Sequence, residues 1–140
     1  MPPLTHRYAI VEHTADTGIE TGADTLADAI GNAAFGMFDL MYDLSSMSAE
    51  MSVTFDTAAV SPPELLVDIL SELLLRSETD DVAFVEFRVH EAGMRAIVDA
   101  AGASTQGLEL RGPPIKAVTY HDLRCEPAGD GWKIRVIFDV

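Results

Sequence analysis

Hydrophobic and polar residues alternate along the last nine residues of the chain, as they do in a half-buried strand. One face carries Trp132, Ile134, Val136, Phe138 and Val140, and the other carries Lys133, Arg135, Ile137 and Asp139. Side chains of a strand point alternately to its two faces, so the first set is the predicted core face. A second alternating run at 116–125 and the Pro/Gly/Asp cluster between the two runs predict a β-hairpin.

The first predicted helix covers residues 25–42, where apolar residues recur at the spacing of one helix face. Asp24 has a side chain suited to the N-cap of this helix. Gly31 and Gly36 lower its helix propensity, but they also allow close packing against a sheet.

The second predicted helix begins after Ser61 and ends near Arg76, before a charged loop at 77–81. Its first residues, Ser-Pro-Pro-Glu, combine a capping box with proline at the first helical position. The apolar stripe of this helix consists of Leu65, Leu66, Ile69, Leu70, Leu73 and Leu74.

Short alternating runs predict the remaining strands, at 7–12, 18–22, 51–55, 82–90 and 94–101. The order of elements, with two separated helices and several hairpins, indicates an α+β domain in which two helices pack on a largely antiparallel sheet. A chain of 140 residues is long enough for one such domain, so we expect residues 1–140 to form a single unit.

Acidic residues outnumber basic ones by 23 to 9, which gives a formal charge of −14. This charge argues against direct binding to RNA or DNA, because that binding depends on Lys and Arg neutralising phosphates. An acidic surface could instead face a basic protein or attract divalent cations, or it could simply keep the protein soluble. The single cysteine, Cys125, and the lack of a predicted signal peptide or membrane span favour a cytoplasmic protein.

Common catalytic motifs are missing, and a lone cysteine argues against a closed Cys/His zinc site. The remaining candidates are the oxygen donors Asp16, Asp43, Asp139 and the terminal carboxylate of Val140, which suit calcium, magnesium or manganese. Each aspartate alone is more typical of a loop or a cap. Asp139 and the terminal carboxylate repel each other, so either Lys116 or a bound metal ion is expected beside them.

His13 and His121 are predicted mainly as hydrogen-bonding residues, with His13 able to orient Asp16 and His121 acting across strands. In an alternative reading, one of them is the general base of a metal-dependent hydrolase. Basic residues that could bind a substrate phosphate are scattered, which weakens that reading. A third alternative is a chaperone or scaffold whose carboxylates only anchor the sheet.

Three stretches together resemble the archease family: Glu12-His-Thr-Ala-Asp16, Phe38-Asp-Leu-Met-Tyr-Asp43, and Lys116-Ala-Val-Thr-Tyr-His-Asp-Leu with the terminal Val-Ile-Phe-Asp-Val. Their order and spacing extend the similarity over nearly the whole chain. The resemblance implies an α+β accessory protein, not itself an enzyme, that activates an RtcB-type RNA ligase in tRNA splicing. It would promote guanylylation and turnover of the ligase and broaden its use of nucleotide triphosphates.

The same resemblance implies a divalent cation, usually calcium, held by Asp16, Asp139 and Val140, with manganese or magnesium as alternatives. Lys116 matches the family's lysine and is expected to matter for activation, while His13, Asp43 and His121 are weaker candidates for contact with the ligase. The sequence departs from the family at Pro113-Pro114, where an acidic residue in a continuous strand would be expected. Proline cannot donate a hydrogen bond to a strand ladder, so the sequence does not determine the backbone conformation that leads into Lys116.

Overall fold

The computed structural model describes residues 7–12 and 16–140, and for Glu12 and Asp16 it describes the backbone alone. The elements are β1 (Ala9–Glu12), β2 (Asp16–Ala23), α1 (Leu26–Met41), β3 (Met51–Ala58), α2 (Pro62–Asp80), β4 (Val82–Ala92), β5 (Arg95–Ser104), β6 (Ala117–Val118), β7 (Arg124–Ala128) and β8 (Gly131–Asp139). All pairings between these strands are antiparallel. The predicted α+β class with two helices is therefore confirmed.

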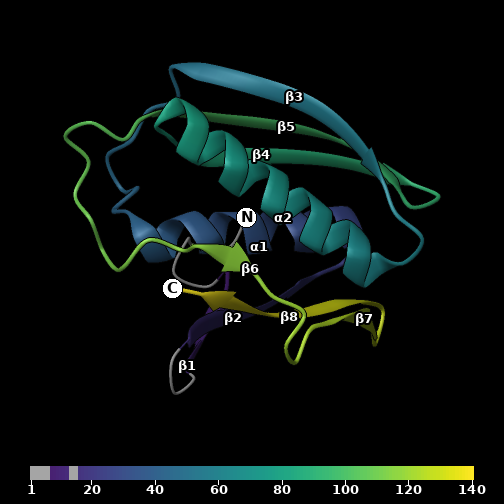
Figure 1. Cartoon of the computed structure of the whole chain (residues 1–140). Coiled ribbons are helices and arrows are strands. Elements are labelled where there is room, and N and C mark those ends of the chain that lie inside the picture. The colour runs from purple at the N-terminus through teal and green to yellow at the C-terminus, as the bar shows by residue number, and fades with distance from the viewer. Residues whose placement is uncertain (1–6, 13–15) are drawn as a thin grey trace.

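The strands form two separate sheets with both helices between them, rather than the single sheet expected from the sequence (Figure 1). Helix α1 contacts β4 of one sheet and both β2 and β8 of the other. All six residues from Ala33 to Phe38 are buried, so no side of this part of the helix faces solvent. A helix that is apolar on all sides must be covered on all sides, and two sheets provide that cover.

The aromatic core of this layer is centred on Phe38 of α1. Its ring makes an edge contact with Phe84 at a centroid distance of 5.6 Å and a stacked contact with Phe87 at 6.0 Å. Both partners lie on β4, so these contacts fix α1 against the three-stranded sheet. On the other side, Ile19 of β2 and Phe138 of β8 are fully buried in the same core.

The five-stranded sheet has the order β1-β2-β8-β6, with β7 also pairing with β8. Strand β8 is therefore central, a position that its apolar alternation does not specify. Ile134, Val136 and Phe138 of the predicted core face are fully buried, whereas Trp132 is only half-buried. Ile137 on the opposite face is also buried, because it lies across from Gly18, which has no side chain to occupy that space.

The three-stranded sheet has the order β3-β5-β4. Strands β4 and β5 form the predicted hairpin, whose turn residues Gly93 and Met94 both have positive φ, of 60° and 64°. Positive φ at both central residues is typical of a tight type I′ hairpin turn. The register between β4 and β5 shifts once, between Phe84 and Glu86.

The N-cap of helix α1 (Leu26–Met41) lies one residue later than predicted. Thr25 is the N-cap, and its hydroxyl accepts a hydrogen bond from the Asp28 N–H at 3.1 Å, so the assignment of this role to Asp24 is wrong. Of the two helix glycines, only Gly36 is closely packed, since a Cβ there would lie 3.0 Å from the Tyr8 ring. A Cβ on Gly31 would meet nothing within 4 Å.

Helix α2 starts as predicted, with Ser61 as the N-cap and proline in the first turn, but it continues to Asp80 instead of ending near Arg76. The six leucine and isoleucine residues of its predicted stripe are all buried. Ser77 extends that buried side, and its hydroxyl donates to the carbonyl oxygen of Val82 at the start of β4. This bond gives the last helical turn a tertiary partner that the local pattern does not reveal.

The first strand of the closing hairpin is interrupted, which differs from the continuous run expected at 116–125. Strand β6 pairs with the end of β8, and β7 pairs with its beginning, with residues 119–123 looping out between them. The turn lies at Gly129 and Asp130, because Ala128 pairs with Gly131. The turn therefore falls within the predicted Pro/Gly/Asp cluster.

Candidate functional site

Asp16 and Asp139, which are far apart in the sequence, are direct partners across β2 and β8. Facing residues of an antiparallel pair have Cα atoms about 4.5–5.5 Å apart. The structure thus brings together the backbones of two of the three predicted metal ligands. The third, Val140, follows Asp139 directly and is half-buried against the core.

The backbone of Lys116 lies beside this chain end, while the expected charge pairing of its side chain with the carboxylates stays a prediction. Its backbone N–H donates to the carbonyl oxygen of Asp139 at 2.7 Å, and the next residue, Ala117, pairs with Asp139. Asp139 is therefore flanked by β2 on one side and β6 on the other. The side chains of Lys116 and Asp139 are both exposed, so solutes and partner proteins can reach them.

The donors at the chain end are carboxylate and carbonyl oxygens, which fit a hard divalent cation better than zinc or copper. Among the side chains that the structure describes, no three His, Cys, Asp or Glu residues are grouped closely enough to hold a metal ion. A site here would therefore depend on Asp16 and the terminal carboxylate in addition to Asp139. That ligand set stays a prediction.

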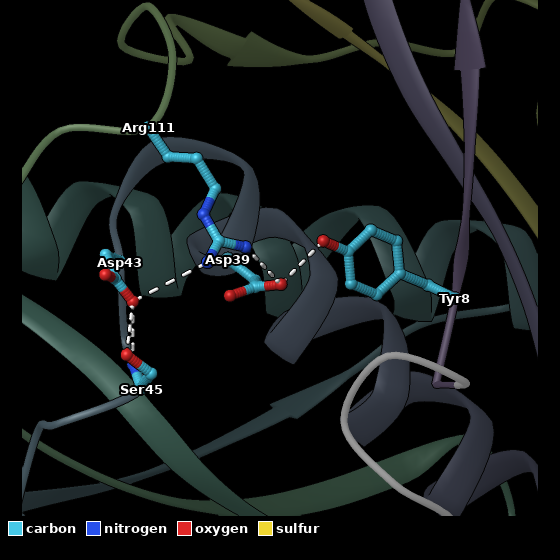
Figure 2. A network of polar contacts seen from close by, with 5 residues as sticks. All are labelled: Tyr8, Asp39, Asp43, Ser45 and Arg111. Atoms are coloured by element: carbon cyan, nitrogen blue, oxygen red, sulfur yellow. Dashed lines mark hydrogen bonds and ion pairs between the residues drawn. The ribbon is translucent and has the colours of Figure 1, made fainter.

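Asp43 lies just after α1 and has its own local partners (Figure 2). Its Oδ1 accepts from the Ser45 hydroxyl at 2.6 Å and the Ser45 N–H at 3.0 Å, and it lies 3.6 Å from Nη2 of Arg111. The hydrogen bonds from Ser45, the hydroxyl first, lower the pKa of the Asp43 carboxyl. These contacts hold the turn after the helix, and a role for Asp43 in binding a partner stays a prediction.

His121 lies in the loop between β6 and β7 rather than within a strand, so the expected cross-strand position is wrong. Its side chain is exposed, and its Nε2 lies 3.4 Å from the carboxylate of Asp122. The His121 N–H donates to the hydroxyl of Thr119 at 3.3 Å. His13 lies outside the described residues.

The sequence analysis missed a polar network around Asp39, which joins three distant parts of the chain (Figure 2). One carboxylate oxygen of Asp39 accepts from the Tyr8 hydroxyl at 2.7 Å and from Nη1 of Arg111 at 3.2 Å. Burial, reinforced by the hydrogen bond to Asp39, raises the pKa of the Tyr8 phenol. The only sign of this network in the sequence was one charged residue, Asp39, among the apolar residues at the end of the first predicted helix.

Within the part of the chain that the structure describes, no helix is long and apolar enough to cross a membrane.

Comparison with known proteins matches residues 8–140 to the model of the Archease protein family. The chain is 35% identical to a protein archease from Methanosarcina acetivorans over the full length of both, and 32% identical to one from Methanopyrus kandleri, covering 93% of this chain and 96% of the relative. Its fold is similar to the solution structure of Methanobacterium thermoautotrophicum protein 1598, with a TM-score of 0.79 at 26% identity and coverage of 96% and 99%.

A crystal structure from Thermotoga maritima, described as an archease and possible chaperone, has a TM-score of 0.64 at 21% identity. The match covers 93% of this chain and 94% of the Thermotoga maritima chain, and at this identity it supports only the fold assignment. The family model and the full-length relatives carry the assignment, and they agree with the three motifs noted in the sequence. This chain belongs to the Archease family.

Proposed function

We propose that this protein activates an RtcB-type RNA ligase of tRNA splicing and has no catalytic turnover of its own. In this role it promotes guanylylation of the ligase, restores its turnover and broadens the nucleotide triphosphates that the ligase accepts. Family membership supports this role, and the lack of common catalytic motifs in the sequence agrees with it. The working compartment in this proposal is the cytoplasm.

The observation that carries the proposal is the convergence at the chain end. Asp16 faces Asp139, and Lys116 is hydrogen-bonded to the Asp139 backbone. In the proposed site, Asp16, Asp139 and Val140 hold one divalent cation, most suitably calcium, and Lys116 offers a positive charge to the ligase next to it. The cation supplies positive charge where the carboxylates would otherwise repel each other.

The formal charge of −14 suits a protein partner better than a nucleic acid. In the proposal, the ligase binds the RNA, and this protein docks on a basic surface of the ligase. Electrostatic attraction of that kind raises association rates and weakens as salt is added. Activation by this protein should therefore need a higher protein concentration at high ionic strength.

The direct test uses a purified RtcB-type ligase, GTP and manganese, and follows covalent guanylylation with and without this protein. We expect faster guanylylation and repeated ligation cycles when the protein is present. No change in either rate would overturn the proposal. Suppression of ligase aggregation without faster guanylylation would support the chaperone alternative, and hydrolysis by this protein alone would support the hydrolase alternative.

A further inference from the structure

The segment that leads to Lys116 is attached to the C-terminal end of α1 instead of crossing solvent as a free loop. We name residues 109–116 the lysine arm. The carbonyl oxygen of Glu109 accepts from the Asp43 N–H at 2.9 Å, and the Arg111 N–H donates to the carbonyl oxygen of Met41 at 2.8 Å. The helix end, which leaves its last carbonyl groups without partners inside the helix, gains a partner from the arm.

Close packing continues along the lysine arm towards Lys116. A Cβ on Gly112 would lie 2.8 Å from the carbonyl oxygen of Leu40, so the backbone passes directly against the helix. Two prolines follow, which restrict φ and need no hydrogen-bond acceptor. Ile115 is then buried, and its N–H points to the sulfur of Met41 at 3.3 Å.

Pro113 and Pro114 are therefore compatible with the position of Lys116. They precede the start of β6 at Ala117, so they interrupt no strand ladder. The departure from the family noted in the sequence thus leaves the path into Lys116 intact. The prolines stiffen the arm and leave the hydrogen bond from Lys116 to Asp139 intact.

Arg111 is the side chain that anchors the lysine arm (Figure 2). Its Nη1 donates to Asp39 at 3.2 Å, and its Nη2 lies 3.6 Å from Asp43, so one guanidinium group spans two carboxylates. The Asp39 side chain is only 15% exposed, whereas that of Arg111 is 48% exposed. A lysine at this position could contact one carboxylate but could not span both with fixed geometry.

Asp39 also connects the arm to the opposite side of the site. The Asp39 oxygen that accepts a hydrogen bond from Arg111 also accepts one from the Tyr8 hydroxyl. Tyr8 immediately precedes β1. Strand β1 pairs along β2 as far as Thr17, the neighbour of Asp16. One carboxylate thus links the segment that ends at Lys116 to the strand pair that contains Asp16.

We propose that Asp39 and Arg111 are positioning residues, which hold Lys116 and the β1–β2 pair in a fixed relation to Asp139. This inference rests on the proposed function, because it assumes that Lys116 and the chain end act together on the ligase. Neither positioning residue contacts the ligase in this view. Their effect is to keep Lys116 from sampling other positions before docking.

The test compares wild type with Arg111→Ala, Arg111→Lys and Asp39→Asn, using Arg124→Ala as the matched control. Arg124 is an exposed arginine of β7, so its substitution makes the same charge change away from the arm. The first readout needs no ligase: hydrogen exchange of the Lys116 amide, compared with amides inside α2. We expect about tenfold faster exchange at Lys116 in Arg111→Ala, no change in α2, and no change in the control.

The second readout is ligase guanylylation at increasing concentrations of each variant. Loss of positioning should lower the maximal rate by about three- to tenfold, with Arg111→Lys between wild type and Arg111→Ala. The inference would be overturned if Arg111→Ala exchanged its Lys116 amide and activated the ligase at the same rates as wild type. If Arg111→Ala does not fold, Asp39→Asn decides by the same two readouts, because it nearly preserves side-chain volume while it removes the charge and replaces one acceptor oxygen with an NH2 donor.

The two proposals fail in different ways. If wild-type protein does not activate the ligase, the proposed function is wrong, and the exchange of the Lys116 amide still decides whether Arg111 holds the arm. If wild type activates and the Arg111 variants behave like the Arg124 control in both readouts, the positioning role is wrong and the proposed function stands.

Discussion

The backbone N–H of Lys116 donates to the carbonyl oxygen of Asp139 at 2.7 Å, which joins the lysine arm to the last residues of the chain. On its other side, Asp139 faces Asp16 of β2. The end of β8 is thus held between two strands, and this arrangement keeps a terminal segment ordered that would otherwise fray. It also gathers one basic and two acidic residues from three separate segments.

Replacing Asp139 with asparagine should weaken calcium binding by at least about tenfold, because a charged oxygen ligand becomes neutral. The matched control is Asp130→Asn, which removes the same charge from the β7–β8 turn, away from the predicted ligands. Isothermal titration with calcium measures both affinities. Equal affinities in the two variants would remove Asp139 from the ligand set.

Replacing Thr25 with alanine should destabilise the protein by about 1 kcal/mol, because the hydrogen bond that caps α1 is lost. Asp24→Ala, one residue earlier, should change the free energy of unfolding by much less. Urea unfolding of the two variants gives the comparison. A larger effect at Asp24 would restore the cap assignment made from sequence.

The two glycines of α1 should respond to alanine in opposite directions. Gly31→Ala should stabilise by about 0.5–1 kcal/mol, since alanine is the better helix former and a Cβ there meets nothing within 4 Å. At Gly36 a Cβ would lie 2.9 Å from Ile19 and 3.0 Å from Tyr8, so overpacking should outweigh that gain and destabilise by about 1 kcal/mol. Thermal unfolding that moves both variants the same way would contradict this packing.

Cys125 should make the protein less stable at alkaline pH. Burial, followed by the nearby charge of Glu126, raises the pKa of its thiol to about 12. In the unfolded chain the thiol has a pKa of about 8.5. Below that pH the thiol is protonated in both the folded and the unfolded protein, so it does not change how stability depends on pH. As pH rises from there towards 12, the unfolded chain loses the proton first and folding becomes less favourable.

The measurement for Cys125 is urea unfolding of wild type and Cys125→Ala at several pH values from 7 to about 10.5. Tyr8 and Tyr42 also have raised pKa values, but they are present in both proteins, so their effects cancel in the difference. The stability advantage of wild type over the variant should fall by at most about 1.4 kcal/mol per pH unit above 8.5. A difference that stays constant over this range would contradict the buried, protonated thiol.

Local pattern in the sequence determined the elements and much of the core. The spacing of apolar residues predicted a helix at 25–42, and the structure has α1 at Leu26–Met41 with both flanking residues as caps. Ser61 and the prolines after it predicted the start of α2, and alternation predicted that Phe138 would be buried. These features depend on neighbours within a few residues, so periodicity and capping chemistry are sufficient to predict them.

Tertiary structure alone decided how the parts combine. Two sheets together cover α1 on all sides, and the bond from Ser77 to Val82 joins the last turns of α2 to β4. The network of Asp39 and Arg111 joins residues 72 positions apart, which no local pattern specifies. Family resemblance implied that Asp16 and Asp139 bind the same cation, but only the pairing of β2 with β8 puts their backbones side by side, because strand register is set by the whole sheet.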